Sequence, residues 1–78
     1  MLIDVLDDRG AGSHSIAIGE WDGDRVLAMR WNGDAGGLGN PQSRGIPTWF
    51  VVPGDYNAKL VETLPEDKQI IAKALLGL

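Results

Sequence analysis

The dipeptide Asp22-Gly23 constrains this chain most, because it lies between two runs in which apolar residues alternate with small or polar ones. Asp-Gly favours the two-residue type I′ turn, whose twist matches that of the strands it joins. A two-residue turn also fixes the register of the hairpin over residues 15–31. The predicted pairs are Trp21 with Asp24, Glu20 with Arg25, Gly19 with Val26, Ile18 with Leu27, Ala17 with Ala28 and Ile16 with Met29.

This register divides the hairpin into two faces, since successive side chains of a strand point to opposite sides. The face predicted to form the core carries Ile16, Ile18, Leu27, Met29 and Trp31. The opposite face has mostly small side chains, with Trp21 at its turn end, so another backbone could approach it closely. Its other members are Ser15, Ala17, Gly19, Val26, Ala28 and Arg30.

Two further segments are predicted strands. Leu2 to Asp7 alternates apolar and acidic residues, which is typical of a short edge strand. Thr48 to Val52 is apolar on both sides, which predicts a strand that is covered on both faces or inserted centrally. Pro53 ends it.

The C-terminal part of the chain is predicted to be helical. Asp55 is the expected N-cap of a first helix, with Tyr56, Leu60 and Leu64 on one stripe. The segment 63–66 has the spacing of a capping box that starts a second helix, and Gly77 is expected to end it. The predicted apolar face of this second helix consists of Ile70, Ile71, Ala74, Leu75 and Leu78.

Together these segments predict one small α+β domain over residues 1–78, with an antiparallel sheet of three to four strands and one or two C-terminal helices. A chain of this length buries only about 60% of its unfolded surface. It has no Cys for a disulfide, so oligomerisation or partner binding is the expected additional source of stability. The longest apolar run, 48–53, is far shorter than the roughly 20 residues of a membrane span, which predicts a soluble, cytoplasmic protein.

The net charge of −4 opposes a surface that follows phosphates non-specifically and favours a basic partner. Acidic residues cluster near the N-terminus and around the Asp22-Gly23 turn. This clustering is typical of solvated surface charge, and the alternative is an acidic edge presented to a basic protein.

The sequence offers little for catalysis. Ser13 or Ser43 could be combined with His14 and an Asp, but no nucleophile-elbow motif surrounds either serine. His14 is expected at a loop or strand start. Asp22 and Asp24 lack the further ligands of a calcium loop, and the loop glycines lack the Gly-Lys-Ser/Thr of a phosphate loop. We therefore expect no enzyme activity, no metal and no cofactor.

The segment Asn32 to Pro47 matches neither helix nor strand periodicity, and loops of this length are commonly functional. Its second half gathers hydrogen-bonding groups between two prolines, and Arg is enriched at interface hot spots. We expect contact with a partner, more than the loop's own packing, to order it. The predicted partner-binding residues are Arg44, Gln42, Asn40, Ser43, Arg30 and Trp21. Two interpretations stay open for the loop's polar groups, partner binding and satisfaction of the loop's own backbone. For Trp31 and Trp49 a core position is expected.

The block from Trp31 to Pro53, WNGDAGGLGNPQSRGIPTWFVVP, resembles a small uncharacterised bacterial or phage protein family with a similar RWNG, GNPQSRG and PTWF arrangement. That resemblance implies no activity. In size, acidity and lack of Cys the chain also resembles phage-encoded inhibitors of host defence, including anti-CRISPR proteins.

Two functions follow as hypotheses. The first is a non-enzymatic protein-binding module, acting as an inhibitor that occupies a surface of a larger assembly, with a nucleic-acid-processing complex or a second copy of the chain as candidate partners. The alternative is a protein that contacts nucleic acid through Arg30, Arg44 and an exposed Trp. Only the second predicts binding that weakens steeply with salt.

Overall fold

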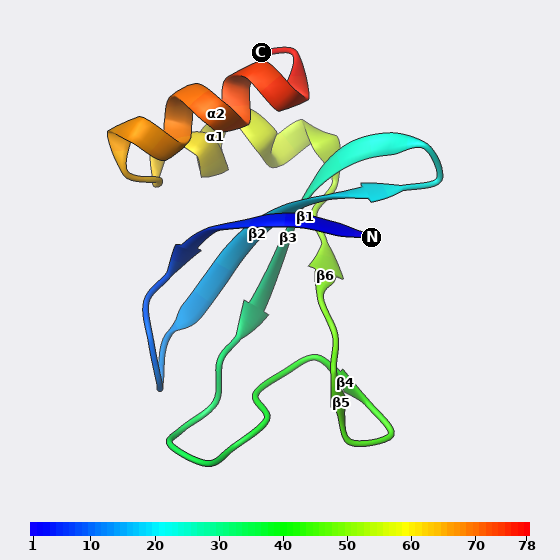
Figure 1. The fold of residues 1–78 in the computed structure, drawn as a ribbon, viewed down its shortest axis with the longest axis vertical. Coiled ribbons are helices and arrows are strands. Elements are labelled where there is room, and N and C mark those ends of the chain that lie inside the picture. The colour runs from blue at the N-terminus through cyan, green and yellow to red at the C-terminus, as the bar shows by residue number, and fades with distance from the viewer.

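The computed structural model describes residues 1–78 and contains a four-stranded antiparallel sheet followed by two helices (Figure 1). The order of strands in the sheet is β1-β2-β3-β6. This arrangement confirms the predicted α+β fold, with strands first and helices last. The elements are β1 (Leu2–Asp8), β2 (His14–Trp21), β3 (Asp24–Trp31), β4 (Gln42–Ser43), β5 (Ile46–Pro47), β6 (Phe50–Val51), a 3-10 turn η1 (Gly54–Tyr56), α1 (Asn57–Glu62) and α2 (Glu66–Leu76).

The hairpin β2–β3 has the predicted register. Ile18 lies opposite Leu27 and Glu20 opposite Arg25, which also form an ion pair of 3.4 Å. Asp22 and Gly23 have φ values of 51° and 85°, the left-handed conformation that a type I′ turn requires at both positions. The turn therefore determines which side chains of the two longest strands face the core.

Strand β1 is an edge of the sheet, as predicted, and is paired only with β2. Its register shifts between Leu2 and Asp4 and again between Val5 and Asp7, which marks two bulges. The second bulge contains Leu6, which is the only residue of β1 buried in the core. Bulges and acidic side chains are both common protections of an exposed sheet edge.

The prediction of a central strand near Thr48–Val52 is wrong. The strand β6 has two residues, Phe50 and Val51, and forms the other edge of the sheet by pairing with β3 alone. Phe50 lies opposite Met29 and is 59% exposed. The segment 48–52 is apolar on both sides because its side chains contribute to an apolar surface on each face of the sheet. The helices cover part of one of these two surfaces.

The predicted side-chain caps of both helices are wrong, although α2 begins at Glu66, within the segment 63–66 that was predicted to start it. The amide of Tyr56 donates to the Pro53 carbonyl, so Asp55 lies inside the 3-10 turn and does not cap α1. Thr63 Oγ1 donates to the Leu60 carbonyl at 2.7 Å, which satisfies the end of α1 and leaves α2 without a side-chain cap. Gly77 does end α2, in the left-handed conformation.

The predicted apolar face of α2 is only partly the one that packs. Ala72 is fully buried and Leu75 and Leu76 pack against the core, whereas Ile70 is 72% exposed. Ile71, Ala74 and Leu78 are exposed as well. Gln69 Nε2 donates to the carbonyls of Leu64 and Glu62, which holds the Gln69–Ala72 side of α2 toward α1. Backbone groups of the preceding turn thus set the rotation of α2.

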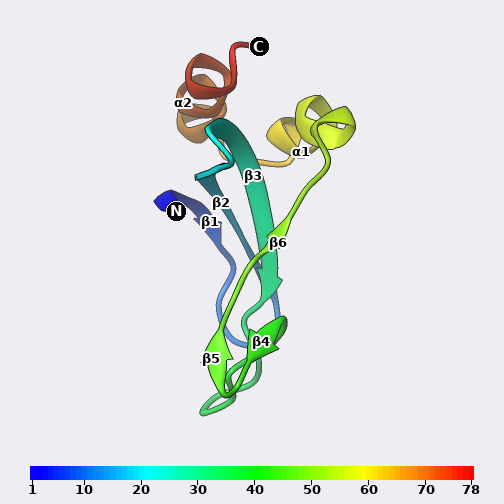
Figure 2. The same ribbon diagram turned by 90° about the vertical axis from the view of Figure 1, so that its right-hand side faces the viewer.

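The core lies between one end of the sheet and the helices. It consists of Leu6, Ile16, Ile18, Leu27, Val52, Val61, Leu64 and Ala72. Both helices gather at this end, while the hairpin of β4 and β5 lies at the opposite end (Figure 2). The helices leave part of their own side of the sheet uncovered, around Phe50, which is 59% exposed. Neither helix is long and apolar enough to cross a membrane.

The rotation of α2 can be tested by placing the same charge at two of its alanines. Ala72→Glu should lower the free energy of unfolding by about 3 kcal/mol or more, because it buries an unpaired carboxylate in a filled site. Ala74→Glu should change it by less than about 0.5 kcal/mol, because Ala74 is exposed. Urea denaturation of both variants measures the difference. Equal effects would contradict the observed rotation.

Candidate functional site

The strands β4 and β5 form a small hairpin, residues 42–47, which we call the Arg44 hairpin. Gln42 pairs with Pro47 and Ser43 with Ile46, so its turn consists of Arg44 and Gly45 alone. These two residues have φ values of 52° and 77°. An arginine is unusual at this left-handed position, where Asn, Asp or Gly is favoured, and for that reason the sequence alone did not indicate the turn.

The base of the Arg44 hairpin is attached to the sheet by backbone hydrogen bonds. Trp31 and Asn40 exchange two of them, at 2.7 and 3.0 Å, and the Thr48 amide donates to the Pro41 carbonyl at 3.0 Å. The peptide bond between Asn40 and Pro41 is cis. At Gly39, φ is +72° and a Cβ atom would overlap the Trp31 carbonyl oxygen. The chain can pass this closely along β3 only because residue 39 has no side chain.

Arg30 holds the loop from the second face of the sheet. Its Nε donates to the Thr48 carbonyl at 3.0 Å, and its Nη2 donates to the Leu38 carbonyl. The guanidinium thus joins the middle of the loop, at Leu38, and the residue that follows the loop, Thr48, to β3. Two of the five N–H donors of the Arg30 guanidinium are engaged within the chain, and the prediction that Arg30 contacts a partner stays a prediction.

Asn32 is a second attachment point, which the sequence did not single out. It accepts a hydrogen bond from Ser15 Oγ at 2.7 Å, and its Nδ2 donates to the Gly10 carbonyl and to Asp8 Oδ1. It therefore connects the start of the loop with the turn between β1 and β2. A side-chain amide after a strand is too common a pattern to predict this role.

These contacts correct the expectation for residues 32–47. The segment contains two short strands, a bridge to β3 and several hydrogen bonds of its own, so it is not a structureless loop. For Arg30, satisfaction of the chain's own carbonyl groups is the better interpretation, whereas Asn40 pairs with Trp31 through its backbone. For the tip of the Arg44 hairpin, the other interpretation stays open.

Of the polar side chains of the Arg44 hairpin, Gln42 donates from Nε2 to the Gly39 carbonyl at 3.3 Å, whereas Ser43 and Arg44 make no side-chain hydrogen bond within the chain. Gln42, Ser43, Arg44 and Ile46 are exposed, and Ile46 is 65% exposed. Arg44 has no hydrogen-bond or ion-pair partner, whereas Arg9 and Arg25 pair with carboxylates and Arg30 binds carbonyls. The structure thus brings Gln42, Ser43 and Arg44 together.

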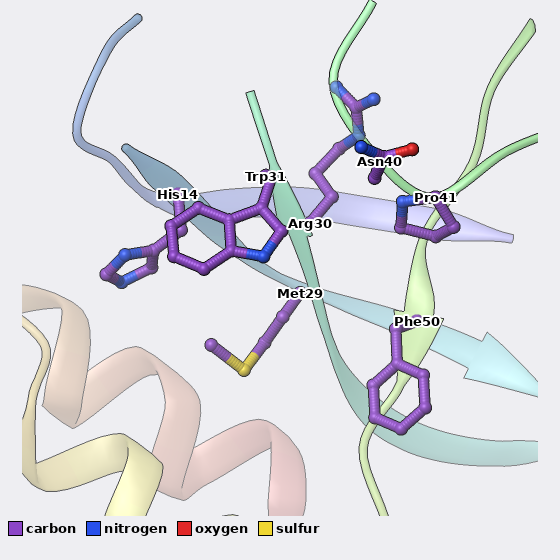
Figure 3. A pocket seen from close by; sticks show the side chains of 7 residues that line it. All are labelled: His14, Met29, Arg30, Trp31, Asn40, Pro41 and Phe50. Atoms are coloured by element: carbon purple, nitrogen blue, oxygen red, sulfur yellow. The ribbon is translucent and has the colours of Figure 1, made fainter. Parts of the chain in front are cut away.

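Next to the hairpin base, on the helix side of the sheet, lies an open hollow of about 270 Å³ (Figure 3). Its walls include His14, Met29, Trp31, Pro41 and Phe50. Trp31 is 61% exposed, so the prediction that it is a core residue is wrong. Its ring contacts the His14 ring edge to face, with 6.2 Å between the ring centroids. His14 begins β2, as expected.

The hollow continues into a second one of about 480 Å³ below α1, and the two share Met29 and Phe50. The second hollow is lined by Tyr56, which is 60% exposed, and by Leu60 of α1. We call the combined surface the aromatic trough and define it by Trp31, Met29, Phe50 and Tyr56. No Asp or Glu lines it.

Trp21 does not join the Arg44 hairpin. It lies at the turn end of the second face, where it lines a hollow of about 320 Å³ with Met1, Leu2 and Trp49. Ala17 and Ala28 in the middle of this face are buried, and Met1 exchanges hydrogen bonds with the Glu20 backbone beside Gly19. Trp21 therefore belongs to a separate surface at the other end of the strands.

Comparison of the chain with protein-family models, curated proteins and solved structures found no match. The functional argument therefore comes from the chain's own surfaces.

The close passage at Gly39 can be tested against a matched glycine. Gly39→Ala should lower the free energy of unfolding by about 3 kcal/mol or more, because it adds a steric overlap to the left-handed strain. Gly36→Ala has a similar φ of +83° but open space, so only about 1 kcal/mol is expected. Chemical denaturation measures both. A Gly39→Ala variant as stable as Gly36→Ala would show that the chain does not pass β3 this closely.

The structural role of Arg30 predicts a loss of stability on truncation. Arg30→Ala should cost about 2 kcal/mol, since it removes two charge-assisted hydrogen bonds that hold the loop. Arg25→Ala is the control and should cost less than about 1 kcal/mol, because its ion pair is exposed. Thermal unfolding of both variants checks this. The brace would be excluded if Arg30→Ala melted at the wild-type temperature.

Proposed function

We propose that this chain is a non-enzymatic protein-binding module that occupies a surface of a larger protein, with the tip of the Arg44 hairpin inserted into the partner. The single observation that carries the proposal is the unpaired Arg44 on a left-handed turn position. A left-handed L-residue costs roughly 1–2 kcal/mol, which a glycine or asparagine at this turn would largely avoid. An arginine kept there at this cost, without a partner in the chain, fits a role in which its guanidinium contacts another molecule.

The base of the hairpin supports the same proposal. Backbone pairing with Trp31, the passage at Gly39 and the Arg30 brace hold the tip in one position before any partner arrives. A preorganised loop loses less conformational entropy on binding, which leaves more of the contact energy as affinity. The fitting partner site is a cleft containing a carboxylate, which the guanidinium could bind with two hydrogen bonds.

The proposal extends to the class of partner and to the location. We propose an inhibitor of the phage-encoded type, with a nucleic-acid-processing complex as the target and the cytoplasm as the compartment. The small acidic domain, its lack of Cys and the poor catalytic inventory are what support this extension.

The alternative, contact with nucleic acid, has less support. Of its two predicted cations, Arg30 is bound to carbonyl groups, and only Arg44 is free. Trp21 is remote from Arg44, although Trp31 is exposed near the base of the hairpin. A salt series with a labelled single-stranded oligonucleotide distinguishes the two, because phosphate contacts weaken steeply between 50 and 200 mM salt, roughly the range over which counterion release acts.

The protein-binding proposal predicts that stability and affinity respond in opposite directions at residue 44. Arg44→Asn should leave the melting temperature unchanged or higher, because Asn-Gly is a favoured pair in this turn. It should weaken partner binding by at least about 30-fold, which corresponds to a hot-spot loss of roughly 2 kcal/mol. Arg44→Ala should weaken binding equally, and Arg25→Ala is the control that removes an exposed arginine elsewhere.

The measurement begins with capture from a lysate of the source cells on immobilised wild-type protein and on each variant. A protein captured by wild type and by Arg25→Ala, but not by Arg44→Asn, is then purified and its affinity is measured by calorimetry. If Arg44→Asn captures the same proteins in the same amounts, or if Arg44→Ala lowers the melting temperature with unchanged affinity, the hairpin is a structural element and the proposal fails.

A further inference from the structure

The aromatic trough is an apolar surface that the fold leaves uncovered on its helix side. Trp31, Phe50 and Tyr56 are exposed by 61%, 59% and 60%. A buried aromatic side chain covers on the order of 150–250 Å², so these three present roughly 350 Å² of apolar surface. The largest apolar patch on a typical monomer is about 300–600 Å² and is often functional, so the trough is a candidate binding surface.

The whole molecule also exposes more surface than a monomer of its mass normally does. Its accessible area is 5080 Å² for 8.4 kDa, against about 4,600 Å² from the scaling of monomeric proteins. Its radius of gyration is 12.4 Å, against about 11.5 Å for a compact domain of this length. The excess follows from helices that cover only one end of the sheet. A second chain packed on the trough would supply the missing layer.

The order of the aromatic side chains makes the trough complementary to itself. Phe50 lies opposite Met29 on the neighbouring strand. Trp31 is two residues after Met29 in β3, toward the Arg44 hairpin. Tyr56 comes after Phe50 along the chain, toward α1. Phe50 is therefore in the middle, as the two hollows that share it also indicate. A two-fold axis through Phe50 would place the Phe50 side chains of the two chains against each other. It would also place Tyr56 of each chain against the end of the other chain's trough that contains Trp31.

Charge permits this contact in spite of the net charge of −4 on each chain. The basic groups in the walls are Lys59, His14 and Arg30, and the guanidinium of Arg30 donates hydrogen bonds to carbonyls. The eleven acidic residues of the chain lie outside the trough. Two troughs can thus meet without bringing carboxylates face to face.

We propose that the aromatic trough is the interface of a two-fold symmetric homodimer, with Phe50 at its centre and Tyr56 of each chain against Trp31 of the other. The three aromatic side chains supply nearly half of the ~800 Å² that each partner of a standard interface buries. Met29, Pro41, Pro53 and Leu60 line the same hollows and extend the contact. The dimer does not depend on the proposed role of the Arg44 hairpin.

Sedimentation equilibrium of the full chain at about 1 and 100 µM tests the proposal. The wild-type mass at the higher concentration should approach twice the 8.4 kDa of one chain. Phe50→Asp should raise the dissociation constant more than about 100-fold, because the two-fold axis places two carboxylates together. Ile70→Asp is the matched control, since Ile70 is 72% exposed on α2 and lies outside the trough; it should dimerise like wild type. Circular dichroism confirms that each variant is folded.

A mixing experiment tests the arrangement itself. Trp31→Glu and Tyr56→Lys should each be monomeric alone, and an equimolar mixture should form a heterodimer, because one wild-type pair and one Lys–Glu pair then form across the axis. A mixture that stays monomeric overturns this arrangement. A wild-type chain that is monomeric at 100 µM, or a Phe50→Asp variant that still dimerises, overturns the interface and leaves the trough to a different protein.

Discussion

The structure depends on the two-residue turn at Asp22-Gly23. The turn sets the register of β2 and β3, and that register puts Ile16, Ile18 and Leu27 on the side where the helices pack. A shift of one residue would move all three to the opposite face. The same register orients Trp31 toward the helix side and Arg30 toward the second face. Adjacent residues of β3 therefore contribute to an exposed aromatic surface and to the hydrogen bonds that hold the loop.

Sequence reasoning succeeded where a local rule determined the geometry. Asp-Gly determined the hairpin, and Gly77 determined the end of α2. It failed where several local conformations fit the sequence equally well and tertiary contacts determined which one forms. The rotation of α2 is set by Gln69 bonding to the preceding turn, and the edge position of β6 is set by the path of a loop that no periodicity describes. An apolar strand at an edge has the same composition as one in the centre, so its sequence could not distinguish the two.

The sequence predicted some residues of the candidate site, but it did not predict how the chain holds them in place. Gln42, Ser43 and Arg44 were expected together because they are neighbours in sequence, and the hairpin keeps them together at its tip. Arg30 was grouped with them by charge alone, yet it binds the carbonyl of Leu38 in the middle of the loop and that of Thr48 directly after the loop. Trp21 was included because it is aromatic and exposed, but the length of the strands separates it from the tip. Charge and exposure identify candidates, and only the path of the chain shows which of them act at one place.

The separation between the base and the tip of the Arg44 hairpin has an evolutionary consequence. The attachments at Trp31, Asn32, Gly39 and Arg30 lie at the base or in the sheet, and residues 43–46 contribute no buried side chain. Substitutions at the tip should therefore change the free energy of unfolding very little, as long as residues 44 and 45 can still adopt the left-handed turn conformation. Such a scaffold can change its specificity quickly while the rest of the sequence stays constant, and it offers an insertion point for grafting foreign recognition sequences.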